Sequence, residues 1–221
     1  MRFVFRYLPS LLFFLSIFFG DLFYVAAGVA VAITAFSAKY GAKTFFALSA
    51  IFWSAGVALM SNTFLSNLCY LIYYPFIFIA IPTLFQISRE IDFVNLIDSA
   101  ILVLGVSTFG AGLLISNEES FFQTMFFIAD LLILIWTFIF AIKRPMTINS
   151  ALITTGISVF TTTDFLFLAN IENYKLGSIL DFGWLFGFVL LAESQYHRAI
   201  TSAPFGPLHP IYVGISIFLS I

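Results

Sequence analysis

Apolar stretches close to 20 residues long recur along the chain, separated by short clusters of charged and turn-forming residues. An α-helix needs about 20 apolar residues to cross the hydrocarbon core of a bilayer. With 62% hydrophobic and 9% charged residues, a water-soluble fold could not cover this much apolar side-chain surface. The sequence therefore predicts an all-α, polytopic integral membrane protein that forms a single helical bundle.

The breaks between these stretches predict eight full spans and a partial ninth. Asp21 separates the first two spans. A cleaved signal peptide is the alternative at this end, since Arg2 and Arg6 precede the apolar residues, although the apolar stretch exceeds the usual length of about 7–15 residues. The short ninth stretch favours a truncated chain over a half-span shielded by other helices. The predicted spans cover residues 3–20, 22–36, 44–60, 67–86, 93–115, 121–142, 148–168 and 179–196, with an incomplete ninth at 211–221.

The basic residues predict the orientation of the chain. If the N-terminus is cytoplasmic, eight of the nine Lys and Arg residues lie in cytoplasmic loops, and Lys175 alone lies outside. Cytoplasmic loops of membrane proteins are enriched in Lys and Arg. This distribution therefore supports a cytoplasmic N-terminus and the separation of the first two spans at Asp21.

Five acidic residues interrupt the apolar stretches: Asp98, Asp130, Asp164, Asp181 and Glu193. An Asp at the centre of a transmembrane helix costs about 2.5 to 3.5 kcal/mol on the insertion scale, so such residues face the protein interior. Asp98 and Glu193 fall in the inner half of their spans. We interpret these two as structural polar residues, because Glu193 can reach the cytoplasmic surface.

The remaining acids are candidates for a ligand-binding or gating site. Asp164 and Asp181 lie near the outer ends of consecutive spans, so we expect them to meet near the external face together with Tyr174 and Trp184. Hydrogen bonding or capping of a helix start is the alternative for Asp181. Asp130 is a further candidate, which we expect near the midplane.

Polar residues within two spans recur at helical spacing. Gln123, Asp130 and Thr137 are spaced by seven and lie on one side of a helix, which predicts a face turned inward. The alternative is polar contact that joins neighbouring helices. A second polar face contains Thr154, Ser158, Thr161 and Asp164.

Tyr70, Tyr73, Tyr74 and Pro75 form an aromatic cluster with a kink-forming proline in the fourth predicted span. Core packing is the favoured interpretation of this cluster. A kinked helix that borders a cavity is the alternative.

The sequence lacks the common catalytic and metal-binding motifs. It contains no H-E-x-x-H, C-x-x-C, phosphate-binding loop or G-x-S-x-G. His197 and His209 have no supporting ligand pattern, so we expect no metal and no cofactor. The net charge of -2 and the lack of a basic patch exclude a nucleic-acid partner.

Six sequence pieces follow one another between Phe52 and His209: FWSAG, YLIYYPFIFIAIPTLF, NLIDSAILVLG, IADLLIL, TTTDFLFLANIENYKLGSILDFGWLFGFVLLAES and LHP. Their order resembles the multi-helix N-terminal membrane region of bacterial, especially actinobacterial, GGDEF and EAL cyclic-di-GMP signalling proteins. The residues that match the pattern are Asp98, Asp130, Asp164, Tyr174, Gly177, Asp181, Gly183 and Trp184.

The resemblance implies a multi-pass input module of the bacterial cytoplasmic (inner) membrane that sends a signal to a cytoplasmic enzyme. The chain has no GGDEF or EAL sequence, and Phe127 and Ile128 replace the usual Tyr-Pro before Asp130. We therefore expect a sensory module without a catalytic output domain and without catalytic residues. The expected partners are the lipid bilayer and a small ligand at the outer face, and homo-oligomerisation remains open.

Two other functions remain as alternatives. Lysoplasmalogenases of the YhhN type are membrane proteins of similar size with buried acids, and TTTDFLFLAN is similar to their late Ser-Asp helix. Paired carboxylates can activate water for ether cleavage. A small solute or ion carrier is the other alternative, although no inverted repeat supports it.

Overall fold

The described part of the chain consists of helices joined by short turns. The computed structural model describes residues 2–19, 25–26, 28–33, 43–85, 118–142, 147–169, 173–174 and 178–197, and these residues contain no strand. This confirms the all-α prediction. The helices are α1 (Arg2–Phe19), α3 (Lys43–Ala58), α4 (Thr63–Leu84), α6 (Glu118–Ile142), α7 (Ile148–Ala169) and α8 (Ile179–Ser194).

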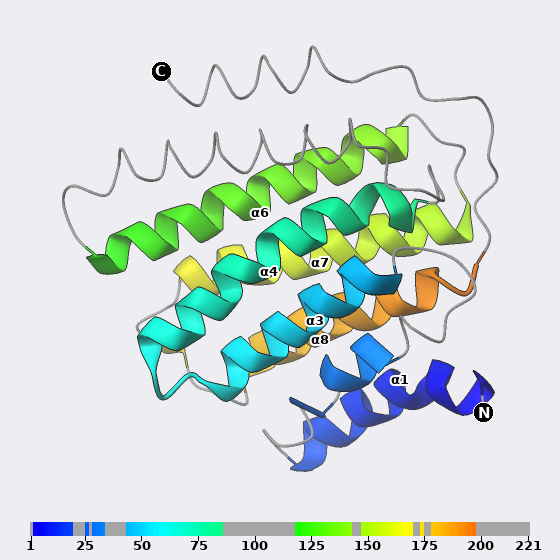
Figure 1. Cartoon of the computed structure of the whole chain (residues 1–221), viewed down its shortest axis with the longest axis horizontal. Coiled ribbons are helices and arrows are strands. Elements are labelled where there is room, and N and C mark those ends of the chain that lie inside the picture. The colour runs from blue at the N-terminus through cyan, green and yellow to red at the C-terminus, as the bar shows by residue number, and fades with distance from the viewer. Residues whose placement is uncertain are drawn as a thin grey trace.

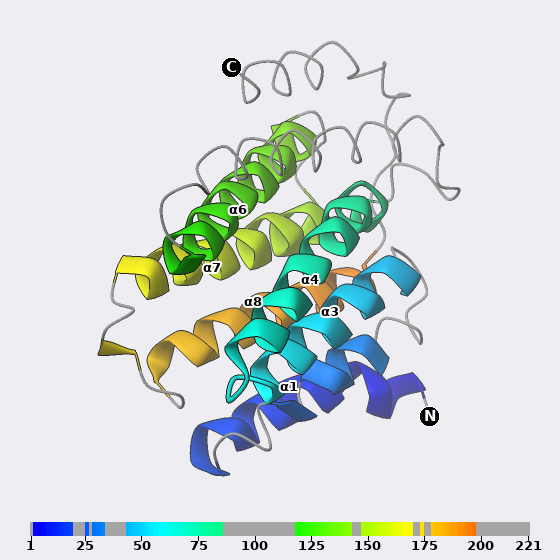
Figure 2. The same cartoon turned by 60° about the vertical axis from the view of Figure 1, so that its left-hand side comes forward.

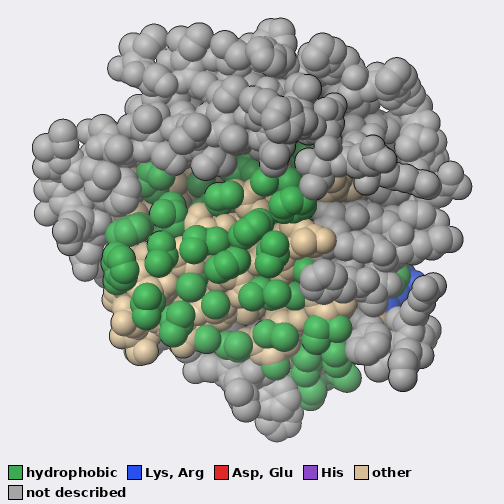
Figure 3. Space-filling model, in the orientation of Figure 1, with side chains coloured by type: hydrophobic (Ala, Val, Ile, Leu, Met, Phe, Trp, Pro, Cys, Tyr) green, Lys and Arg blue, Asp and Glu red, His purple; other side chains and the backbone are tan. Residues whose placement is uncertain are grey.

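Within the described residues, three helices are long and apolar enough to cross a membrane. They contain the stretches Thr63–Leu84, Phe122–Ala141 and Ile148–Ala169. Large hydrophobic side chains remain exposed along these helices, and Figure 3 shows how hydrophobic side chains are spread over one face of the described helices. The exposed side chains include Phe64, Leu65 and Leu68 on α4, Phe127, Leu131, Ile135 and Phe138 on α6, and Ile148 and Leu166 on α7.

The structure does not support the predicted count of eight full spans and a partial ninth. Helices α3 and α8 each contain 16 residues, and the apolar part of α1 is the shorter stretch Arg6–Leu15. The prediction ended α3 two residues late, at Met60, because Leu59 and Met60 at the start of the turn are apolar and give no sign that the helix ends at Ala58. The predicted spans 93–115 and 211–221 lie outside the described residues, as do 22–24, 27 and 34–36 of the predicted span 22–36.

The helices form a bundle in which neighbours along the chain lie side by side. Helix α3 packs against α4, and α7 packs against both α6 and α8 (Figure 1). Helix α6 also contacts α4, and α1 lies along α8 at the edge of the bundle (Figure 2). The turn between α3 and α4 and the start of α6 therefore lie at the same end of the bundle as the end of α7.

The hairpin of α3 and α4 is fixed by two side-chain hydrogen bonds. Asn62 caps α4, because its side chain accepts a hydrogen bond from the Leu65 backbone N–H at 3.1 Å. Ser66 donates to the Gly56 carbonyl oxygen at 2.8 Å. A Cβ at Gly56 would lie 2.6 Å from the ring of Tyr70, so the missing side chain lets Tyr70 pack against α3.

Helices α7 and α8 meet almost backbone to backbone. A Cβ at Gly156 would lie 2.9 Å from the Gly187 carbonyl oxygen, and a Cβ at Gly187 would lie 2.8 Å from that of Gly156. Small residues permit this close approach between helices in membranes. Phe160 and Thr163 of α7 border the same contact, facing Gly187 and Gly183 respectively. We call these five residues the α7–α8 seam.

Candidate ligand-binding site

An aromatic cavity of about 290 Å³ lies between α3, α4, α6, α7 and α8. Most of its wall is aromatic, with two carboxyl groups and a few polar side chains among the rings. A cavity of this size is at the lower end of the range for small-molecule sites. The lining residues are Trp53, Met60, Thr63, Ser66, Asn67, Tyr70, Tyr73, Tyr74, Phe122, Gln123, Phe126, Asp130, Phe160, Asp164, Phe167, Leu168 and Trp184.

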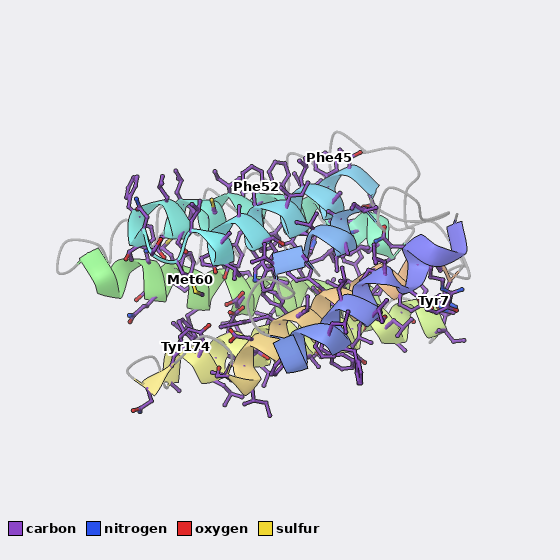
Figure 4. All side chains as sticks on the ribbon, turned by 90° about the horizontal axis from the view of Figure 1, so that it is seen from below. Tyr7, Phe45, Phe52, Met60 and Tyr174 are labelled. Atoms are coloured by element: carbon purple, nitrogen blue, oxygen red, sulfur yellow. The ribbon has the colours of Figure 1, made fainter. Side chains whose placement is uncertain are left out.

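One end of the cavity lies at an end of the bundle. Met60 and Thr63 come from the turn between α3 and α4, Gln123 from the first turns of α6, and Leu168 from the end of α7. Figure 4 shows Met60 and Tyr174 at this end and Tyr7 at the opposite end. In the orientation predicted from the basic residues, this end faces the outside of the cell.

Asp130 and Asp164 form a carboxyl pair on the cavity wall. Tyr74 donates its hydroxyl proton to Asp130 Oδ1 at 3.0 Å. Trp184 donates its indole N–H to Asp164 Oδ1 at 2.6 Å. The two carboxyl groups lie within hydrogen-bonding reach of each other. The pair therefore connects α6 directly to α7, with one aromatic donor from α4 and one from α8.

Each member of this pair keeps one buried oxygen without a partner. Asp130 is 0% exposed, and its Oδ2 has no hydrogen-bond partner among the described residues. The same holds for Oδ2 of Asp164. An ionised carboxylate only accepts hydrogen bonds, so two of them bond to each other only through a proton. The pair must therefore either share a proton or accept hydrogen bonds from a third group.

The structure pairs Asp164 with Asp130, whereas the sequence suggested Asp181 as its neighbour. Asp181 is 2% exposed and accepts a hydrogen bond from the Tyr174 hydroxyl at 2.6 Å. The rings of Tyr174 and Trp184 lie 6.1 Å apart between centroids, so aromatic contact connects the two acids. Asp130 and Asp164 meet because α6 and α7 pack side by side in antiparallel directions.

The other acids have separate places in the molecule. Glu193 of α8 forms an ion pair with Arg6 of α1, so it ties α1 to α8. It also accepts a hydrogen bond from Nε2 of His197 at 3.1 Å. The structural role predicted for Glu193 stays a prediction. Asp98, the other acid interpreted as structural, lies outside the described residues.

The predicted inward face of α6 is confirmed. Asp130 and Thr137 are both 0% exposed, and Gln123 lines the cavity. Tyr73 and Tyr74 are buried, as the core interpretation expects. They also line the cavity, as the alternative interpretation of the aromatic cluster predicted.

Sequence reasoning missed the polar residues of the α4 wall and the contribution of α3. Thr63, Asn67, Tyr70 and Tyr74 recur at intervals of three or four residues along one side of α4. This mixed polar and aromatic face was a usable signal, because a lipid-facing side of a helix carries few polar residues. Trp53 gave no such signal, since its place on the wall depends on how α3 packs.

The described residues contain no group of three or more His, Cys, Asp or Glu side chains that could hold a metal ion. Comparison of the chain with models of protein families, with curated proteins and with solved structures finds no match. The described groups that could bind a ligand or take part in a reaction at this site are thus two carboxyl groups, their Tyr74 and Trp184 donors, and the aromatic wall.

Proposed function

We propose that the chain is a sensory or regulatory module of a bacterial inner membrane that binds a small ligand in the aromatic cavity. The observation that carries the proposal is the carboxyl pair of Asp130 and Asp164, which lies on a cavity wall with two buried oxygens unpartnered. Buried polar atoms in folded proteins are almost always hydrogen-bonded. A bound ligand would supply the missing donors.

Ligand binding would act on the packing of the helices. The cavity wall combines residues of α3, α4, α6, α7 and α8, so a ligand that fits one helix arrangement better than another shifts the population toward it. Trp184 connects the carboxyl pair to α8 through its hydrogen bond with Asp164. At the opposite end of α8, Glu193 holds Arg6 of α1. A displacement of α8 would therefore reach the end of the bundle that we propose to be cytoplasmic.

The proposed output is a cytoplasmic enzyme, in keeping with the resemblance to the membrane regions of GGDEF and EAL proteins. The multi-pass topology with a cytoplasmic N-terminus belongs to the same proposal. Its support is the one-sided distribution of basic residues, together with three helices that could span a membrane.

A chimera tests the sensory function. A diguanylate cyclase domain is joined to the chain through an added span, and the cellular level of cyclic-di-GMP is measured. Asp130→Asn and Asp164→Asn should change the output, because both substitutions alter the hydrogen bonding of the pair. Asp181→Asn is the matched control, since this buried acid bonds Tyr174 and does not line the cavity. Output that equals the parent chimera in all three variants would contradict the proposal.

Hydrolysis is the second candidate function, and the carboxyl pair is the observation that favours it. Two carboxyl groups in contact can share a proton and activate a water molecule, as in aspartic proteases. The proposed substrate class is lysophospholipid, as in membrane lysoplasmalogenases. Purified protein should then turn over lysophospholipid, and Asp130→Asn and Asp164→Asn should abolish turnover. Absence of turnover by folded wild-type protein would exclude this candidate.

A further inference from the structure

The unpartnered oxygens of the carboxyl pair define what a ligand must offer. Oδ1 of Asp130 and Oδ1 of Asp164 already accept hydrogen bonds, from Tyr74 and Trp184. Oδ2 of each acid is buried and has no partner within the described residues. A matching ligand needs two hydrogen-bond donors on one small group, because the two carboxyls lie within hydrogen-bonding reach of each other.

The charge of the cavity selects among such ligands. Among the described residues that line it are two acids and no Lys, Arg or His. A buried charge is tolerated in a protein when it is paired with an opposite charge and hydrogen-bonded. A cationic donor group therefore fits this wall, and an anionic group would face uncompensated repulsion.

The aromatic wall also favours a positively charged ligand. Trp53, Tyr70, Tyr73 and Trp184 all line the cavity that contains the acids. The faces of such rings attract a cation by about 0.5–2 kcal/mol or more, depending on desolvation. Their edges and faces also bury the apolar part of a ligand. The wall thus suits a molecule with a cationic head and a short hydrocarbon or aromatic body.

We propose that the cavity binds a small primary or secondary amine in its ammonium form. The ammonium group donates one N–H to Oδ2 of Asp130 and one to Oδ2 of Asp164, and it takes the place of the proton that the pair would otherwise share. The body of the ligand packs against the aromatic wall. This inference rests on the proposed ligand-binding function and names its ligand class.

Four probes with a common phenylalkyl body separate the contribution of the positive charge from that of the N–H donors. They are 2-phenylethylamine, 2-phenylethanol, trimethyl(2-phenylethyl)ammonium and 3-phenylpropanoate. The amine offers a positive charge and several N–H donors. The alcohol has one donor and no charge, the trimethylammonium has charge and no donor, and the carboxylate has the opposite charge. All four probes carry a phenyl group, so the aromatic part that must fit the cavity of about 290 Å³ is the same in each.

Binding of the probes is measured by isothermal titration calorimetry with the full chain in lipid nanodiscs. We expect the amine to bind at least about tenfold more tightly than the alcohol and the trimethylammonium, the scale of one hydrogen bond to a charged group. The carboxylate should show no binding. Equal affinity for amine and alcohol, or tighter binding of the trimethylammonium, would overturn the proposal.

Substitution of the acids gives a second test. Asp130→Asn and Asp164→Asn each keep an oxygen for the Tyr74 or Trp184 donor, remove one charge, and place an N–H₂ donor beside the remaining carboxylate. Amine affinity should fall at least about tenfold in each variant and stay unchanged in Asp181→Asn. If the two variants do not fold, the probe series on the wild-type chain still decides the question.

The amine proposal and the sensory proposal fail in different ways. If the chimera responds to Asp130→Asn while 2-phenylethylamine binds no better than 2-phenylethanol, the sensory function stands and the amine proposal is wrong. If amines bind selectively but no variant changes the chimera output, the cavity is an amine site and the sensory function is wrong.

Discussion

Helix α7 takes part in two contacts of opposite character. Toward α8 it presents Gly156, which lies so close to Gly187 that even a methyl group would meet backbone. Toward α4 and α6 it presents Phe160 and Asp164 on the wall of a cavity of about 290 Å³. The α7–α8 seam leaves no space between helices, and the cavity keeps space that aromatic rings and two acids do not fill.

The difference shows how side-chain size and charge divide one bundle into fixed and adjustable parts. Glycine allows van der Waals contact between backbones, which is the main source of attraction between helices in lipid. Large rigid rings around two carboxyl groups cannot close on each other without burying the acids against apolar surface. We therefore expect α7 and α8 to move as one unit and the cavity to adapt around its occupant.

Replacing the residue at the boundary between the two contacts should have the largest effect. Phe160 is 3% exposed, lines the cavity, and packs against Tyr73 and Phe188 with ring centroids 5.6 and 5.2 Å away. Phe160→Ala should lower the free energy of unfolding by about 3–5 kcal/mol. Denaturant titration of the protein in detergent micelles measures the change. Leu166→Ala, at a site 49% exposed on the same helix, is the control, and equal losses in both variants would refute a packing role for Phe160.

The seam should be sensitive to a single methyl group. Gly156→Ala should lower the free energy of unfolding by about 1–3 kcal/mol, because the new Cβ meets the Gly187 carbonyl oxygen and the helices must separate. At Gly183 the nearest atom to a new Cβ is Oγ1 of the Thr163 side chain, at 2.3 Å. Turning this hydroxyl away breaks its hydrogen bond to the Val159 carbonyl oxygen but moves no backbone, so Gly183→Ala should cost less, about 0.5–1.5 kcal/mol. The same titration compares the two, and a larger loss at Gly183 would show that backbone contact does not limit the seam.

Removing a hydroxyl group from the cavity wall should lower the free energy of unfolding by less, because it removes a hydrogen bond and leaves the packing of the ring in place. Tyr74→Phe deletes the hydroxyl that donates to Asp130, which should lower the free energy of unfolding by about 1–2 kcal/mol. Tyr73→Phe is the matched control, since the hydroxyl of this buried neighbour makes no hydrogen bond within the described part of the chain. Thermal unfolding of both variants gives the comparison. Identical stability of Tyr74→Phe and wild type would mean that the pair does not depend on this donor.

The contact of α1 with α8 should matter least to stability. Arg6 and Glu193 form an ion pair in which both side chains are 29% exposed, and such pairs contribute about 0–1 kcal/mol. Arg6→Gln and Glu193→Gln should each have an effect of this size. The double variant should lose no more than the sum of the two. A coupling energy well above about 1 kcal/mol in this cycle would place α1 among the fixed parts of the bundle.

The positions of the helices could be predicted from local sequence, because the hydropathy of a stretch and the polar residues that end it are visible within a few residues. The predicted spans 121–142 and 148–168 differ from α6 and α7 by no more than three residues at either end. The inward face of α6 followed from the spacing of Gln123, Asp130 and Thr137. The predicted end of α3 at Met60 was two residues late, because Leu59 and Met60 are apolar although they already belong to the turn before α4.

The pairing of Asp164 with Asp130 could not be predicted from local sequence. Periodicity shows which side of a helix faces inward, but not how far a neighbouring helix is shifted along its axis. A shift of one turn moves a partner by about 5.4 Å, which decides whether Asp164 meets Asp130 or another group. Trp184 and Tyr174 were expected near the acids, and they are. Their division between Asp164 and Asp181 required the packed structure.

The cavity wall brings together parts of the chain from Trp53 to Trp184. Such long loops must close before the wall exists, so the cavity is complete only in the fully assembled bundle. A molecule that binds there recognises the native state alone and raises the free energy of unfolding by mass action. Supplying a cavity ligand during synthesis would then increase the yield of folded protein, and the rescue of unstable variants such as Gly156→Ala would report occupancy without any knowledge of the downstream signal.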